Sequence, residues 1–187
     1  MQIFTKLIKS ILVVLILSSS VTAQENSSQM SSTEKEEIAF LLFDNYETLD
    51  VFGPAEIFGR LTDLYTLKFY SLEGGIVTNR HQVPIMTEKL ADINKKPFAF
   101  LIPGGLGTRI EVNNDKLITS IKDISLSSTY VMTVCTGSAL LAKTGLLNKR
   151  MATSNKRAFA WVATNGPDVQ WDKEARWKVD ENYYTSS

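Results

Sequence analysis

Short apolar runs recur along this chain, and each is followed by a turn and a segment with helical periodicity. The runs show little alternation, as is typical of strands covered on both faces, and they occupy residues 37–43, 97–102 and 130–134. The segments that follow carry apolar side chains at roughly helical spacing and occupy residues 48–61, 114–127 and 138–147. Buried strands that alternate with helices predict an α/β fold with a doubly wound, mostly parallel sheet.

Shorter elements complete the pattern. Residues 65–70 alternate and predict a further strand, and two strand-like pieces follow at residues 76–78 and 83–86. Pro54 predicts a helix start or an irregular first turn in its neighbourhood. Near the C-terminus, two segments are expected to form the arms of a polar-faced hairpin, residues 169–172 and 175–180.

The ends of the predicted strands carry the candidate chemistry. In a parallel sheet the carboxyl ends of the strands meet at one edge, and ligands bind beyond that edge. The first strand leads to Asp50, the second to the Gly104-Gly105 turn and the third to Cys135. We therefore expect these residues to lie close together in space.

Cys135 is the only cysteine of the 187 residues, and it follows a predicted strand and precedes a predicted helix. This is the layout of a nucleophile elbow, which holds a reactive side chain on a sharp turn at the edge of a sheet. The helix N-terminus is expected to lower the pKa of the thiol and so to favour the thiolate. The alternative is a cysteine that only fills the core.

Attack on an acyl-like or nitrile-like electrophile also requires donors for developing negative charge and a proton carrier. The neighbouring residues offer both. Backbone N–H groups of Thr136 and of the Gly104-Gly105 turn are candidates for stabilising developing negative charge. Asp50 or Glu56 is the candidate proton carrier. Asp50 has the alternative role of capping the helix that it begins.

The first residues differ from the rest of the chain. Residues 1–23 combine two lysines, a short apolar core and small residues at their end, which predicts a cleaved signal peptide and a periplasmic or secreted protein. The apolar core is shorter than the about 20 residues of a spanning helix, so an uncleaved anchor is disfavoured. Residues 24–37 are rich in Ser, Glu and Gln and predict a flexible linker, which leaves residues 38–187 as the domain.

Composition excludes several classes of function. Without residues 1–23 the chain carries 18 basic and 20 acidic residues, which gives no electrostatic case for binding nucleic acid or an anionic membrane. One cysteine forms no internal disulfide, and one histidine offers no Cys/His cluster for a structural metal. That histidine, His81, is expected to be a surface loop residue rather than a base.

Four stretches of the chain resemble, in the same order, the motifs of the ThiJ/PfpI superfamily of deglycases and PfpI-type proteases. They are residues 38–43, 49–56, 101–107 and 134–138. The isocyanide hydratase branch, and the similar domains fused to AraC-type regulators, resemble this chain most. The resemblance implies a flavodoxin-like sandwich with a cysteine at the elbow, a small-molecule substrate and a homodimer. No cofactor is expected.

The resemblance also assigns roles to residues. Cys135 matches the nucleophile, Asp50 matches the acid that hydrogen-bonds the thiol, and Thr136 matches the residue after the nucleophile in the hydratase branch. Gly104 and Gly105 match the turn on the oxyanion side. The implied reaction is that of a hydro-lyase, in which the sulfur attacks the terminal carbon of an isocyanide and water completes an N-substituted formamide.

The chain departs from the family pattern in three places. PfpI-type proteases carry histidine at the position of Thr136, and many members carry histidine near Asn155. Because Asn155 orients water or substrate but carries no proton, both changes disfavour protease and deglycase chemistry. Relatives also continue into a C-terminal helix that is expected to be missing here. A non-catalytic small-molecule-binding domain or a redox-sensing thiol is the alternative function.

Overall fold

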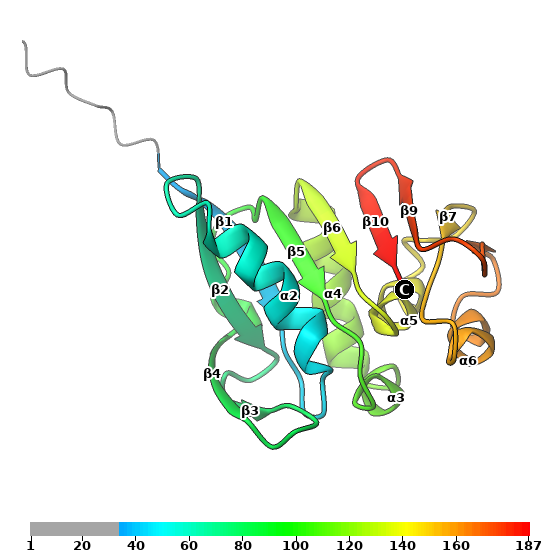
Figure 1. The fold of residues 1–187 in the computed structure, drawn as a ribbon, viewed down its shortest axis with the longest axis horizontal. Helices are drawn as coiled ribbons and strands as arrows, with labels where there is room; N and C mark the ends of the chain where they lie inside the picture. The colour runs from blue at the N-terminus through cyan, green and yellow to red at the C-terminus, as the bar shows by residue number, and fades with distance from the viewer. Residues whose placement is uncertain (1–33) are drawn as a thin grey trace, which may run out of the picture. The chain divides into compact units, whose positions relative to one another are not determined.

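An eight-stranded sheet forms the centre of the fold (Figure 1). The structure is a computed structural model, and it describes residues 34–187. Across the sheet the strands have the order β3-β4-β2-β1-β5-β6-β10-β9. Their bounds are β1 (Glu36–Leu41), β2 (Tyr65–Ser71), β3 (Gly75–Thr78), β4 (Pro84–Lys89), β5 (Ala99–Ile102), β6 (Tyr130–Thr133), β9 (Trp177–Asp180) and β10 (Tyr183–Ser186). The strands from β4 to β10 in this order pair in parallel, and only the edge strands β3 and β9 pair antiparallel. The predicted α/β fold with a mostly parallel sheet is confirmed.

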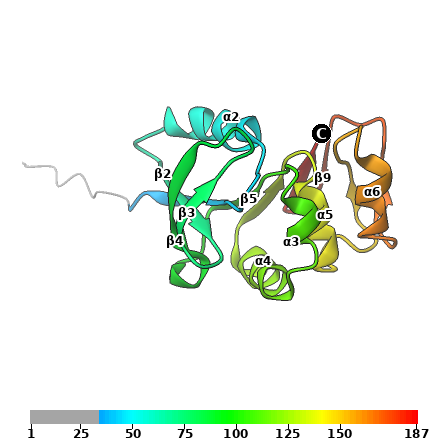
Figure 2. The ribbon, with the colours of Figure 1, turned by 90° about the horizontal axis from the view of Figure 1, so that it is seen from below.

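Helices cover both faces of the sheet (Figure 2). Helix α2 (Thr48–Gly59) lies on one face and α4 (Asp115–Ser127) on the other. The other helices are short: η1 (Leu90–Asp92), α3 (Thr108–Glu111), α5 (Gly137–Lys143) and α6 (Phe159–Thr164). No helix within residues 34–187 has the length and apolar content that crossing a membrane requires.

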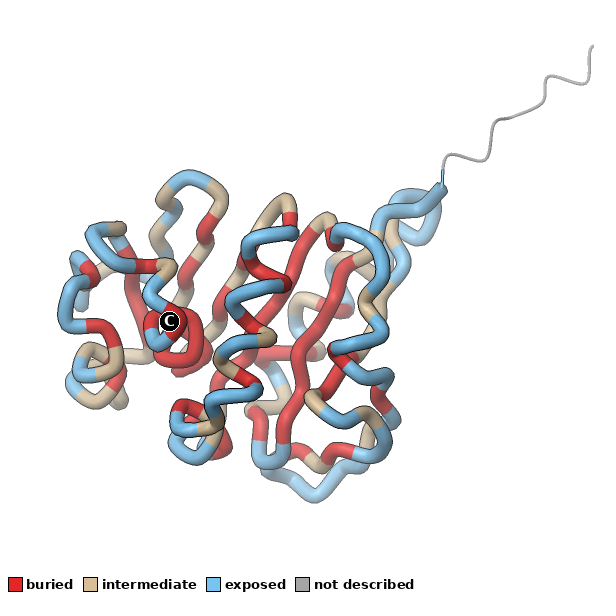
Figure 3. The backbone as a smooth tube through the Cα atoms, turned by 180° about the vertical axis from the view of Figure 1, so that it is seen from behind, coloured by how far each residue is buried: buried red, intermediate tan, exposed pale blue. Residues whose placement is uncertain are grey.

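The core lies along the central strands, which are buried over most of their length (Figure 3). Every residue from Ile38 to Leu42 is fully buried, as expected for a continuous apolar run covered on both faces. Helix α4 adds Leu117, Ile121 and Ile124 to the core at helical spacing. The Asn114 side chain caps this helix by accepting a hydrogen bond from the Leu117 N–H at 3.3 Å.

The N-terminal boundary differs slightly from the expected one. The predicted signal peptide of residues 1–23 lies outside the described residues, as does the linker up to residue 33. Strand β1 begins at Glu36, inside the segment predicted as linker. The ladder with β2 extends the strand, because Glu36 pairs with Tyr65 and the Glu37 carboxylate accepts a hydrogen bond from the Tyr70 hydroxyl at 2.9 Å.

Two local expectations are wrong. Pro54 neither starts a helix nor disturbs a first turn, because α2 begins at Thr48 and runs through it. The C-terminal hairpin is formed by β9 and β10, whereas β8 (Gln170–Trp171) pairs in parallel with β7 (Met151–Ala152). The Asp172 carboxylate accepts hydrogen bonds from the N–H groups of Glu174 and Ala175, and this turn separates the two predicted arms.

Candidate active site

Cys135 lies on the sharp turn between β6 and α5, as the sequence predicts. Its φ of +56° is in the left-handed region that a non-glycine residue adopts only when its surroundings impose it. Both backbone groups of Cys135 are hydrogen-bonded. The Cys135 N–H donates to the Ser186 carbonyl at 3.0 Å, and the Cys135 carbonyl accepts from the Ser154 hydroxyl at 2.9 Å. The strained elbow is therefore fixed from β10 and from the segment after β7.

Gly137 allows the elbow to sit against the neighbouring strand. A Cβ atom at this position would collide with the carbonyl oxygen of Ile102, the last residue of β5. The ends of β5 and β6 lie on the side of the sheet where α3 and α5 are found (Figure 1). The carboxyl ends of these two parallel strands thus form one edge, as a doubly wound sheet requires.

Asp50 faces the elbow from the first turn of α2. It is only 8% exposed, and its Oδ2 accepts a hydrogen bond from the Gly104 N–H at 2.9 Å. The capping role considered for Asp50 is not observed, because the N-cap position belongs to Glu47. The thiol of Cys135 also hydrogen-bonds the Asp50 carboxylate, so the two side chains form a pair.

The Gly104-Gly105 turn packs directly against the elbow. A Cβ at Gly104 would lie 2.5 Å from the Thr136 nitrogen and 2.8 Å from Cys135 Cβ, so only glycine allows this approach. The glycine N–H groups were expected to stabilise negative charge on a substrate. Instead, the Gly104 N–H donates to Asp50, and the Gly105 N–H donates to the Thr136 hydroxyl at 3.0 Å. The turn therefore positions Asp50 and Thr136.

Thr136 and Asn155 supply the donors that reach the sulfur. Hydrogen bonds from the Thr136 N–H and from the Asn155 side chain both act to lower the pKa of the Cys135 thiol. The Asn155 Oδ1 accepts from the Ala158 N–H at 3.1 Å, which leaves its amide NH₂ to face the sulfur. These donors are the groups available for charge that develops near the thiol.

The electrostatic balance of the pair differs from the expectation of a low thiol pKa. Burial, followed by the charge of Asp50, raises the pKa of Cys135 to about 11 and outweighs the hydrogen bonds that lower it. Burial also raises the pKa of Asp50 to about 6, against the lowering effect of the Gly104 hydrogen bond. Near pH 7 the pair therefore holds one proton, on sulfur, with the charge on the carboxylate. The N-terminus of a helix as short as α5 does not lower the pKa of Cys135 below that of Asp50.

A cavity of about 310 Å³ opens over Cys135. It is lined by Glu47, Arg80, Gly105, Leu106, Arg109, Cys135, Thr136, Asn155, Arg157 and Ala158. Four of the six predicted site residues line it, and the other two, Asp50 and Gly104, are buried and hydrogen-bonded to each other. This volume is at the small end of the range of about 300–1,000 Å³ for ligand pockets and fits a small molecule.

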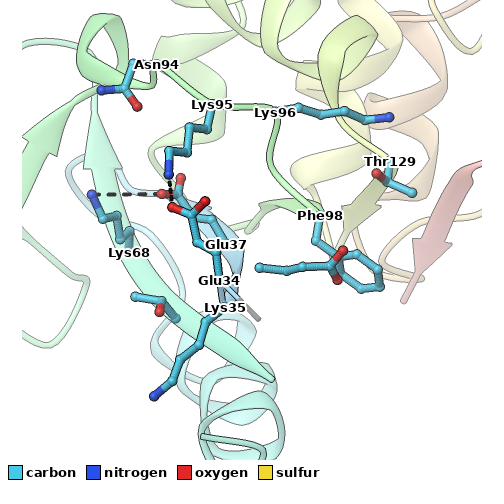
Figure 4. Close-up of a pocket in the computed structure, with 11 residues that line it drawn as sticks. Glu34, Lys35, Glu37, Lys68, Asn94, Lys95, Lys96, Phe98 and Thr129 are labelled. Atoms are coloured by element: carbon cyan, nitrogen blue, oxygen red, sulfur yellow. Dashed lines mark hydrogen bonds and ion pairs between the residues drawn. The ribbon is translucent and has the colours of Figure 1, made fainter. Parts of the chain in front are cut away.

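A second cavity of about 550 Å³ lies at the opposite edge of the sheet (Figure 4). It surrounds the N-terminal end of β1, where Lys95 pairs with Glu34, and Lys68 lies 3.9 Å from Glu37. Cys135 and Asp50 are not among its lining residues. The exposed Lys95–Glu34 pair is a feature of an ordinary solvated surface.

The remaining candidates lie away from the thiol. Glu56 is exposed and pairs with Arg60 at 3.3 Å, so it does not act as the proton carrier. His81 is an exposed residue of the β3–β4 connection, and its Nδ1 lies 2.7 Å from the Thr48 hydroxyl. Within residues 34–187 no group of three His, Cys, Asp or Glu side chains is arranged to hold a metal ion.

Sequence reasoning missed the hydroxyl groups that support the site. The Ser138 and Ser154 hydroxyls lie 2.8 Å apart, and both contact the Cys135 carbonyl. The Thr108 hydroxyl lies 3.1 Å from that of Thr136. Serine and threonine are common throughout the chain, so only spatial proximity identifies these three.

Gly105→Ala is expected to destabilise the protein by about 2–4 kcal/mol. At a φ of +127° its Cβ would lie 2.5 Å from the Asn45 carbonyl oxygen. Gly75→Ala is the matched control: its φ is also positive but its Cβ would meet no atom within 4 Å, so a loss of about 1 kcal/mol is expected. Urea denaturation measures both. Equal losses would show that backbone conformation alone determines the effect.

Residues 36–187 match the DJ-1/PfpI family. A match over most of the chain, together with the elbow cysteine on a mostly parallel sheet, shows that the chain belongs to this family.

Individual relatives are distant. The isonitrile hydratase of Pseudomonas putida is 26% identical over 151 residues, which are 80% of this chain and 64% of that protein. The chain thus spans less than two thirds of the length of this curated relative. A ThiJ/PfpI family protein from Pseudomonas syringae has a similar structure, with a TM-score of 0.74 and 24% identity over 91% of this chain and 70% of that chain. An AraC family transcriptional regulator from Pseudomonas putida has a TM-score of 0.61 and 17% identity, and the match covers 81% of this chain and 83% of that chain.

Proposed function

We propose that this protein is a cysteine-dependent hydro-lyase that adds water to an isocyanide-like carbon and yields an N-substituted formamide. The observation that carries the proposal is the pairing of Cys135 with Asp50 beneath a small cavity, with Asn155 at the sulfur. Such a site has a nucleophile and a proton carrier but no imidazole. The likeness to isonitrile hydratase supports the same chemistry.

In the first step the thiol adds across the terminal carbon of the isocyanide. Asp50 accepts the proton from Cys135 as the S–C bond forms, and the same proton is then delivered to that carbon. The product is a thioimidate, R–N=CH–S–Cys135, and no electrons are gained or lost. The Thr136 N–H and the Asn155 amide stabilise charge on the sulfur while the proton is in transit.

In the second step water attacks the thioimidate carbon. Asp50 accepts a proton from the water and passes it to the imine nitrogen, which gives a tetrahedral adduct. Its C–S bond then breaks, the hydroxyl proton returns through Asp50 to sulfur, and R–NH–CHO leaves. One water is consumed in each cycle and the thiol is regenerated, as hydration requires.

The direct test is turnover of phenyl isocyanide by the purified chain, with N-phenylformamide measured by chromatography and mass spectrometry. The proposal expects product formation and a covalent adduct on Cys135. Absence of both product and adduct would contradict it.

The second candidate is a non-catalytic binding or sensing domain. It is favoured by the raised pKa of Cys135, because a protonated thiol is a poor nucleophile until a base removes its proton. The fold it shares with a transcriptional regulator is consistent with a binding role. This candidate expects reversible ligand binding without product.

The rate is expected to depend on the ionisation of Asp50. Burial raises the pKa of Asp50 to about 6, and the protonated carboxyl cannot accept the thiol proton. We expect kcat/KM to fall about tenfold per pH unit below pH 6 and to be level from about pH 7 to 10. A pH–rate profile measures this, and a profile that instead rises steeply towards pH 11 would show that pre-formed thiolate is the reactive species.

A further inference from the structure

The mouth of the cavity over Cys135 is basic. Its lining includes three arginines and one glutamate, and the glutamate, Glu47, is paired with Arg80 at 2.7 Å. Arg109 and Arg157 have no carboxylate within ion-pair distance among residues 34–187. The proposed hydration chemistry uses neither guanidinium, so both are left without an assigned role.

Arg109 is held in place by an aromatic ring. Its guanidinium carbon lies 4.5 Å from the ring centroid of Trp161, on helix α6, and Trp161 packs against the core. Stacking on a ring face leaves the N–H groups at the edge of the guanidinium plane free to bind a ligand. Because its position is already constrained, Arg109 loses less conformational freedom on binding than a mobile surface arginine does.

Arg157 reaches the same cavity from another segment. It lies two residues after Asn155, whose side chain hydrogen-bonds the Cys135 sulfur. Arg109, by contrast, belongs to α3, which follows the Gly104-Gly105 turn. Two guanidinium groups that have no ion-pair partner among residues 34–187 therefore line one cavity, on segments that also position the nucleophile.

We propose that Arg109 and Arg157 form a subsite for a carboxylate, and that the substrate is a small molecule with a carboxylate a few bonds from its electrophilic carbon. Guanidinium binds carboxylate oxygens in a planar, bidentate manner and remains charged at all working pH values. A cavity of about 310 Å³ accommodates a compact compound of this kind. For the hydration reaction, which rests on the function proposed above, isocyanoacetate is the simplest such substrate.

The subsite can be tested without turnover, by alkylating Cys135 with iodoacetate and with neutral iodoacetamide. The ratio of the two rates on one thiol cancels its thiolate fraction. Relative to the same ratio for N-acetylcysteinamide, a thiol without other charges, we expect preference for iodoacetate by about tenfold, on the usual scale of electrostatic steering. Because Asp50 is negative when ionised, a ratio above that of this neutral thiol requires the arginines to outweigh it.

Substitutions of the two arginines test whether they cause the preference for iodoacetate. Arg157→Gln and Arg109→Gln are each expected to lower the ratio about two- to fivefold, the scale of one exposed charge, and the double variant to remove the preference. Arg60→Gln, at the exposed end of α2, is the matched control and leaves the ratio unchanged. A wild-type ratio at or below that of N-acetylcysteinamide, or one that the double variant does not lower, overturns the subsite.

Equilibrium binding tests the same subsite independently of thiol reactivity. By calorimetry, N-formylglycine is expected to bind more tightly than neutral N-methylformamide, and the Arg109→Gln/Arg157→Gln double variant is expected to remove the difference. If carboxylates are preferred but no isocyanide is hydrated, the proposed reaction fails and the subsite stands. If phenyl isocyanide is hydrated at least as well as isocyanoacetate and N-formylglycine shows no advantage, the subsite fails and the reaction stands.

Discussion

Asp50→Asn is expected to lower kcat/KM by about 10²–10⁴ and, at the same time, to stabilise the fold at pH 7. The loss of rate follows because an amide accepts no proton from Cys135. The gain in stability follows because burial raises the pKa of Asp50 from 3.8 to about 6, so the folded protein holds an unfavourable charge at neutral pH. This shift corresponds to at most about 3 kcal/mol of unfolding free energy. The asparagine oxygen still accepts the Gly104 N–H.

The pH dependence of stability distinguishes this explanation from a simple packing effect. Below about pH 4, Asp50 is protonated in both the folded and the unfolded chain, and its cost is absent. As the pH rises from about 4 to 6 the wild type should lose stability relative to Asp50→Asn, and above pH 6 the difference should be constant. Urea denaturation at pH 4 and pH 7 measures this. Asp63→Asn, an exposed substitution, is the control, and a stability difference that is equal at both pH values would contradict the charge explanation.

Cys135→Ala is expected to lower the rate of hydration by more than about 10⁴, because no other described side chain at the cavity is a comparable nucleophile. The adduct seen by intact-mass measurement after incubation with phenyl isocyanide should disappear in the same variant. The variant should remain folded, because the backbone bonds to Ser186 and Ser154 do not involve the sulfur.

Cys135→Ser is the companion variant. It keeps a side chain of similar shape, but a hydroxyl is far harder to deprotonate than a thiol, so activity should also be lost. Residual hydration in Cys135→Ala above about one per cent of the wild-type rate would show that water reacts without a covalent step.

The Cys135–Asp50 pair combines two features that each oppose the stability of the fold. A buried carboxyl and a cysteine at positive φ are both unfavourable features. Each is held by backbone groups from distant segments, namely Gly104 for Asp50 and Ser186 for Cys135. A perturbed pKa at a side chain that lines a cavity, as at Cys135, is a common feature of functional sites.

Self-association and export remain predictions. The predicted signal peptide and periplasmic or secreted location depend on residues 1–23, which lie outside the described residues. N-terminal sequencing of the exported protein and sedimentation of the purified chain would address these two points.

Local patterns in the sequence predict the mostly parallel α/β fold and the elbow at Cys135. These features follow from local patterns: continuous apolar runs predict buried strands, helical spacing predicts α4, and a cysteine between a strand and a helix predicts the elbow. Each is encoded within about 15 neighbouring residues, the window over which periodicity is informative. Parallel strands then bring Asp50, Gly104 and Cys135 to one edge.

Which groups act on one another at that edge depends on long-range packing, and the sequence pattern does not predict it. The pKa of Cys135 is raised rather than lowered because burial and Asp50 outweigh the short helix α5. The N–H groups of Gly104 and Gly105 bind protein acceptors rather than a ligand. Likewise β9 pairs with β10, and Arg109 and Arg157 share one cavity. Burial, charge and hydrogen bonding depend on neighbours far apart in the chain, and a pattern of adjacent residues does not contain that information.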